Sequence, residues 1–175
     1  SLLQAPRGEL EQLLASQEID LAIAVLHGQY PPSIKVIELV RFPLVLLAPE
    51  EGGARSFAAL CKREAERITE PLVTLAADNA LNRIFQDELV ERGVTWEPRV
   101  EVSSLDLVAS YTALGYGYGL SVDAPGIKLP DGLRRLPLRG FPPMRLGLLF
   151  QGKMKPVAER FALAAAAQAK KLKSP

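Results

Sequence analysis

The first 28 residues combine a helical pattern with an apolar run. Leucines recur at helical spacing within residues 10–14, which is typical of a helix that buries one stripe. After a polar interruption, residues 21–24 are almost purely apolar, as expected of a parallel strand that is covered on both faces. Ligands of open α/β sheets bind at the carboxyl ends of such strands. We therefore predict that the residues at the end of this strand, Val25, Leu26 and His27, line a ligand site.

Strand and helix patterns alternate along most of the remaining chain. Strand patterns occur at 34–40, 42–49, 71–76, 100–102, 118–122 and 144–150, and helical patterns at 56–67, 80–92, 104–114 and 155–171. This alternation indicates an α/β fold with right-handed crossovers and mostly parallel sheets. Between residues 123 and 143, five prolines and several glycines interrupt it. Their composition favours connecting turns and edge strands in this part of the chain.

Polar residues stand where two of the predicted helices begin. Asp78 and Asn79 follow the strand at 71–76, and Ser103 with Asp106 forms a capping-box pattern after the strand at 100–102. The free N–H groups and the positive dipole end of such helices suit a carboxylate or another small anion. The predicted ligand contacts here are Ala76, Ala77, Asp78, Asn79, Ser103 and Ser104.

Each candidate contact also has a simpler structural interpretation. Asp78, Asn79 and the two serines can act as helix caps alone, and Asp78 would repel an anionic ligand. His27 is the only histidine; it can bind a ligand, respond to pH or lie in a solvated loop. Trp96 can stack on a ligand or pack beside the sheet, as can Tyr116 or Tyr118. The sequence leaves these alternatives open.

Composition excludes several classes of function. The 21 Lys and Arg residues and 20 Asp and Glu residues leave a formal net charge of +1, so no overall field attracts nucleic acid or acidic membranes. Cys61 is the only cysteine and belongs to no metal-ligand spacing. No apolar run approaches the roughly 20 residues that span a bilayer, and no leader precedes Leu2. We expect a cytoplasmic protein without a metal or cofactor.

The motifs of common enzymes are absent from the sequence. It contains no nucleophile elbow, zinc-protease helix or phosphate loop. His27 and Cys61 lie on different predicted elements and form no obvious dyad. Gly115, Gly117 and Gly119 do not match the dinucleotide fingerprint, because the third glycine comes one residue too early and the segment follows a helix. Left-handed turn geometry explains these glycines more simply, so we expect a binding protein and not an enzyme.

Four segments together resemble the effector-binding domain of LysR-type transcriptional regulators. They are residues 13–24, 42–49, 71–76 and 100–121, with an acidic residue, Asp20, before the first strand and a glycine turn at 115–119. The resemblance covers nearly the whole chain in the family's order and spacing. It implies a two-lobed fold similar to type 2 periplasmic binding proteins, in which a small molecule is held between the lobes.

Connectivity divides the expected elements into two lobes. Lobe I comprises residues 1–45 and 124–175, lobe II comprises 46–123, and the crossings lie near 44–48 and 119–123. The resemblance further implies a homodimer or tetramer and an effector that is an organic acid or an amino-acid-like metabolite. DNA would be bound only through a winged helix-turn-helix domain that this chain lacks. The family pattern also places one strand and one helix before Leu2 or Leu3, and the sequence contains neither.

A solute-binding protein of a transport system is the alternative interpretation. It has the same fold but is exported and acts as a monomer, and its mature form would also lack a leader. The short length of the chain and its regulator-like motifs favour the regulator.

Overall fold

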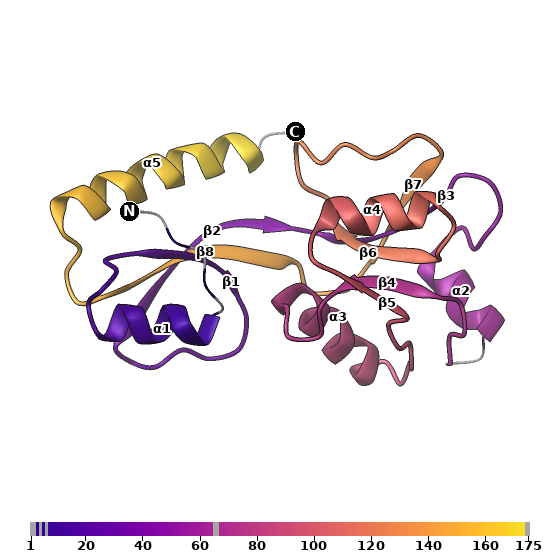
Figure 1. Ribbon diagram of the computed structural model, residues 1–175, viewed down its shortest axis with the longest axis horizontal. Helices are drawn as coiled ribbons and strands as arrows, with labels where there is room; N and C mark the ends of the chain where they lie inside the picture. Colours follow the sequence, from indigo (N-terminus) through magenta and orange to yellow (C-terminus); the bar gives the residue numbers. More distant parts are fainter. Residues whose placement is uncertain (1–2, 4, 6, 65–66, 174–175) are drawn as a thin grey trace. The chain divides into compact units, whose positions relative to one another are not determined.

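The computed structural model describes residues 3, 5, 7–64 and 67–173, and the chain divides into two compact units. Unit 1 comprises residues 1–41 and 145–175, and unit 2 comprises residues 42–144 (Figure 1). The chain therefore passes between the units twice, between Arg41 and Phe42 and between Met144 and Arg145. The first crossing lies just before the position predicted from connectivity, 44–48, whereas the second lies far beyond the predicted 119–123.

Unit 1 is built around a three-stranded sheet with the strand order β1-β8-β2. Its elements are α1 (Arg7–Ala15), β1 (Ala22–Leu26), β2 (Ile34–Phe42), β8 (Met144–Gln151) and α5 (Pro156–Lys173). The predicted stripe of α1 is confirmed, because Leu14 is 1% exposed and Leu10 packs against the same core. The buried residues of this core are Leu14, Ala22, Leu26, Ile34 and Leu149.

The prediction that residues 21–24 form a parallel strand covered on both faces is wrong. β1 pairs antiparallel with β8, with Ala22 opposite Leu149 and Leu26 opposite Arg145. β1 is one of the two outer strands of the described sheet, and the side chain of Ile23 is 50% exposed. An apolar run predicts a strand but not the direction of its partner, which here comes from the distant end of the chain.

Unit 2 contains a five-stranded mixed sheet with the strand order β5-β4-β6-β3-β7. β4 lies parallel to β5 and β6, whereas β3 lies antiparallel to β6 and β7. The elements are β3 (Leu44–Pro49), α2 (Phe57–Glu64), β4 (Leu72–Leu75), α3 (Ala80–Glu91), β5 (Val100–Val102), α4 (Leu105–Ala113), β6 (Tyr118–Val122) and β7 (Leu133–Pro137).

Helix α2 is shorter than the predicted helix at 56–67. It ends at Glu64, residues 65–66 lie outside the described residues, and Arg67 forms an isolated parallel bridge with Thr95. Its start agrees with the prediction, because Ser56 Oγ accepts the N–H of Ala59 at 3.1 Å.

The sheet of unit 2 carries different cores on its two faces. Helix α4 contributes Val108 and Ala109 to an aliphatic core with Val45, Leu47 and Val73 of the sheet. Figure 1 shows α3 on the face opposite α4. On that side, Phe141 packs edge-on against Phe57 of α2 and stacks on Phe85 of α3, with ring centroids 5.2 and 5.6 Å apart. The sheet is therefore buried on both faces, as its apolar strands predict.

Residues 124–144 belong to unit 2 and not to the lobe that we predicted for them. Strand β7 pairs with β3, with Val45 opposite Pro137 and Pro49 opposite Leu133. Arg134 reinforces this pairing. Its Nε donates to the carbonyl of Pro49, the last residue of β3, at 3.0 Å, and its Nη2 donates to the carbonyls of Gly52 at 3.3 Å and Ala54 at 3.0 Å in the loop that follows. As predicted, this proline-rich region supplies an edge strand and turns.

Within the part of the chain that is described, no helix combines the length and apolar character that a membrane crossing requires.

Candidate functional site

The parallel pairing of β4 and β5 brings two predicted site segments to the same end of the sheet. The last paired residues are Leu75 on β4 and Val102 on β5. Residues 76–79 continue from β4 and residues 103–104 from β5, so both segments begin at one level. We call this region, residues 76–79 and 103–104, the β4–β5 end. Both segments lead directly into a helix, α3 or α4.

Asn79 and Ser104 cap the two helices at the β4–β5 end. The Asn79 side chain accepts the N–H of Leu81 at 3.0 Å, and Ser104 Oγ accepts the N–H of Leu107 at 3.3 Å. Both cap residues have extended backbones, which is the usual conformation at an N-cap. The cap of α4 is therefore Ser104 and not Ser103, because the extended residue directly before the helical turn can reach the third helical N–H.

The other predicted contacts in unit 2 lie on the surface. Ala76, Ala77, Asp78 and Ser103 are exposed, whereas Asn79 and Ser104 are half-buried. The Ala76 carbonyl accepts the N–H of Asn79 at 2.9 Å and closes a turn before α3. Each cap takes up one N–H of its helix, and other first-turn N–H groups have no acceptor within a helix. The β4–β5 end therefore combines two positive helix ends with accessible backbone.

The predicted contacts in unit 1 differ in what their side chains can offer. Leu26 is 5% exposed and belongs to the core of the unit, so only its backbone is available to a ligand. The Val25 carbonyl accepts a hydrogen bond from the Tyr30 hydroxyl at 3.3 Å. His27 is half-buried directly after β1, and Gly28 follows with a φ of 66°. Tyr30 was not predicted from the sequence and folds the 27–33 loop back onto β1.

Two buried polar residues beside the β4–β5 end were also missed. Thr74 is 0% exposed on β4, and Asn82 is 2% exposed in the first turn of α3. The Asn82 amide donates to the carbonyl of Leu75 at 3.4 Å and so ties α3 to the end of β4. Thr74 Oγ1 and Asn82 Oδ1 have no hydrogen-bond partner among the described residues. Unpaired buried polar atoms are rare and costly, and here they lie under the candidate site.

The tryptophan and the glycine turn have structural roles. Trp96 is 2% exposed, donates from Nε1 to the Glu70 carbonyl at 2.7 Å and packs edge-on against Tyr118. Gly117 has a φ of 128°, and a Cβ there would lie 2.1 Å from the Pro71 carbonyl oxygen. Glycine is required at this position because the backbone closely approaches Pro71, directly before β4, and because it has left-handed geometry.

The described residues contain no group of three or more His, Cys, Asp or Glu side chains that could hold a metal ion. Cys61 is a free, half-buried thiol on α2. Burial raises its pKa, and this effect outweighs the opposing influences of a backbone hydrogen bond and the charge of Arg92. A raised pKa lowers the thiolate fraction and therefore the nucleophilicity at neutral pH.

Comparison with known proteins identifies relatives of this chain. The family model described as the LysR substrate binding domain matches residues 1–170. No curated protein matches the chain significantly. The cofactor-binding domain of the Cbl transcriptional regulator is a similar solved structure, with a TM-score of 0.77 and 20% identity. The match covers 99% of this chain and 80% of the chain of that domain.

Two further structures agree with this fold. The effector-binding domain of QuiR in complex with shikimate has a TM-score of 0.74 and 14% identity, and the match covers 98% of this chain and 81% of that one. HinK, a LysR family transcriptional regulator from Pseudomonas aeruginosa, has a TM-score of 0.74 and 22% identity. The match covers 95% of this chain but only 58% of HinK, so the chain spans little more than half of that regulator's length. The predicted two-lobed α/β fold is confirmed.

Proposed function

Because this chain belongs to the LysR substrate-binding domain family, we propose that it senses a small anionic metabolite on behalf of a transcriptional regulator. Domains of this family belong to regulators and not to enzymes, which is consistent with the absence of enzyme motifs from the sequence. The protein is expected to act in the cytoplasm, and a DNA-binding segment beyond these 175 residues is expected to contact the DNA.

The observation that carries the proposal is the parallel register of β4 and β5, which brings two capped helix ends together. The positive ends of α3 and α4 and their first-turn N–H groups favour a negatively charged group. Asp78 is exposed at the same end and opposes this attraction, so a ligand that avoids Asp78 or carries a donor toward it binds best. Shikimate, the ligand in the QuiR structure, is a carboxylate, which supports an organic acid as the effector class.

The contribution of unit 1 stays a prediction. Val25, Leu26 and His27 stand at the end of β1, and the backbone of this segment and the His27 ring are the groups that they can offer. We propose that an effector which also binds these residues prefers one arrangement of the two units, since a ligand shifts a conformational equilibrium only by its differential affinity.

A thermal-shift screen of small carboxylates, each compared with its neutral amide, tests the ligand class. Organic acids are expected to raise the melting temperature and their amides to have no effect. The ligand-induced shift should shrink in Asn79→Ala and Ser104→Ala, because each variant alters one of the two helix ends. If no acid stabilises the protein, or if acid and amide act equally, the proposal fails.

Ser56→Ala is the matched control for the loss of a helix cap. Ser56 caps α2, which follows β3. Because β3 runs antiparallel to β6 and β6 runs parallel to β4, α2 begins at the opposite end of the sheet. Ser56→Ala should lower the melting temperature without ligand, as the other cap variants do, but leave the ligand-induced shift unchanged. An equal loss of this shift in all three variants would indicate general destabilisation instead of a site.

We further propose that the domain acts as a homodimer or tetramer. Exposed apolar side chains support this: Val157 and Phe161, one helical turn apart on α5, are 69% and 49% exposed. In unit 2, Val90 and Leu114 are 76% and 73% exposed. Sedimentation velocity across the micromolar range should show self-association that Val157→Lys weakens. A protein that stays monomeric throughout that range would contradict the proposed assembly.

A further inference from the structure

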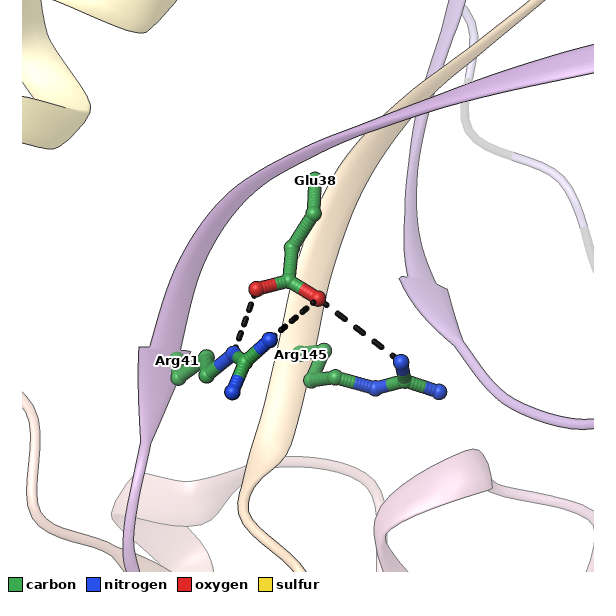
Figure 2. Close-up of polar contacts among 3 residues, drawn as sticks. All are labelled: Glu38, Arg41 and Arg145. Carbon is green, nitrogen blue, oxygen red and sulfur yellow. Dashed lines mark hydrogen bonds and ion pairs between the residues drawn. The ribbon is translucent and has the colours of Figure 1, made fainter.

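Glu38 binds two arginines at the positions where the chain leaves and re-enters unit 1. Glu38 and Arg41 lie on β2, and Arg145 begins the second segment of unit 1 on β8. Arg41 donates from Nε to Glu38 Oε1 at 2.5 Å and from Nη2 to Oε2 at 3.2 Å. Arg145 Nη1 lies 3.7 Å from the same Oε2 atom. Figure 2 shows the single carboxylate between the two guanidinium groups.

The ion pair between Glu38 and Arg41 spans two buried residues of β2. Leu39 and Val40 are 9% and 4% exposed, and successive side chains of a strand point to opposite faces. The bidentate ion pair therefore spans a segment of β2 that is buried on both faces, immediately before the chain leaves unit 1.

Arg145 is held to both neighbouring strands. Its backbone lies opposite Leu26 of β1, while its side chain reaches Glu38 on β2. β8 approaches β2 closely just beyond this point, because a Cβ on Gly147 would lie 2.8 Å from the Ile37 carbonyl oxygen. Glu38 therefore provides a side-chain link between the two strands that join the units, where each of them crosses the boundary.

We propose that Glu38 is an ionic clamp that makes β2 and β8 behave as one connection between the units. With the clamp closed, a distortion of one strand at the boundary is transmitted to the other, so the two strands open together. The Glu38 side chain is 27% exposed, and this partial burial strengthens its charge interactions relative to a freely solvated pair. Glu38 also raises the pKa of Arg41, first through the hydrogen bond and then through its charge.

Hydrogen exchange of the effector-free 175-residue chain tests the clamp independently of the proposed function. In Glu38→Gln, the backbone amides of residues 39–42 and 145–147 should both exchange on the order of twofold to fivefold faster, as expected when an ion-pair network at a local opening site is lost. In 1 M salt the parent chain should approach the variant, because screening weakens exposed ion pairs.

Arg145→Gln separates coupling between the strands from a local effect of Glu38. This variant leaves the Glu38–Arg41 pair in place but removes the link to β8, so exchange should still rise in both segments. Asp20→Asn is the matched control: it breaks the 2.6 Å ion pair with Lys155, which lies elsewhere in unit 1, and should change neither segment. The proposal is overturned if Glu38→Gln behaves like Asp20→Asn, or if either clamp variant accelerates exchange in one strand only.

Discussion

Thr74→Val replaces a buried hydroxyl that has no hydrogen-bond partner among the described residues. Thr112 in the same unit provides the matched comparison. Both threonines are 0% exposed, but the Thr112 hydroxyl donates to the Val108 carbonyl at 2.8 Å. Valine has nearly the shape of threonine, so each substitution exchanges a hydroxyl for a methyl group and little else. The two variants differ mainly in whether a hydrogen bond is lost.

Only Thr112→Val is expected to lower the free energy of unfolding. An unpaired buried hydroxyl costs about 1–3 kcal/mol, so Thr74→Val should leave stability unchanged or raise it by about 1 kcal/mol. The strand position favours this result, because valine fits a half-buried pleated surface well. Thr112→Val removes a satisfied hydrogen bond whose net contribution is about 0.5–1.5 kcal/mol. We therefore expect Thr112→Val to be the less stable variant by about 0.5–2.5 kcal/mol.

Urea unfolding monitored by tryptophan fluorescence measures both changes. Trp96 is the only tryptophan and is 2% exposed within unit 2, so its emission reports on the unit that contains both threonines. Midpoints should shift while the slopes of the transitions stay the same. If Thr74→Val loses as much stability as Thr112→Val, the Thr74 hydroxyl has a partner that the protein contacts do not supply, and the reasoning from its unpaired state is refuted.

Three further predictions follow from local geometry. In the same urea assay, Gly117→Ala should lower the free energy of unfolding by at least about 3 kcal/mol, because the added Cβ would meet the Pro71 carbonyl. Gly115 has a φ of 84° and open space around it, so Gly115→Ala should lower it by only about 1–2 kcal/mol. Equal losses in the two variants would contradict the clash at Gly117. Arg134→Met should lower the free energy of unfolding by about 1–3 kcal/mol, because it removes the hydrogen bonds that Arg134 donates to backbone carbonyls. An unchanged urea midpoint would show that these hydrogen bonds do not contribute to stability. Because burial raises the pKa of Cys61, alkylation at pH 7 should be slower in the folded chain than in urea, and the gap should narrow as the pH rises; a constant gap would indicate shielding alone.

The parts of the fold that were predicted correctly depend on signals within a few residues. Asn79 was predicted at a cap position because a strand ends directly before it and an amphipathic helix follows. Gly115 was predicted to lie in a left-handed turn after a helix, and it has a φ of 84°. In each case the conformation is set by local sterics and hydrogen bonds, which a short stretch of sequence contains.

The pairing of strands depended on residues far apart and was predicted less well. The partner of Ala22 is Leu149, and no feature near either residue states whether the pair is parallel. The assignment of 124–144 to lobe I failed for the same reason, because β7 gains its place by pairing with β3. The proline-rich composition of residues 124–144 does not indicate that β7 pairs with β3.

The candidate site shows the same division between local and distant information. The end of β4 and the cap at Asn79 were visible in the sequence. The unpaired state of Thr74 was not, because threonine is common in strands and its burial depends on the packing of the sheet. Tyr30 was missed because its hydroxyl reaches back to Val25 across the turn at residues 26–29, and hydrophobic periodicity does not predict the path of a turn.

Capping and the proposed ligand binding at Asn79 and Ser104 are separable because they would use different N–H donors of the same helix. The cap oxygens take up the N–H groups of Leu81 and Leu107, while an anion would bind the remaining first-turn N–H groups. Loss of a cap should therefore lower stability by about 1 kcal/mol without ligand. If the cap also orients the helix end toward an anion, the same variant should lose more stability with ligand than without it. If the residue serves as a cap alone, the loss should be the same in both conditions.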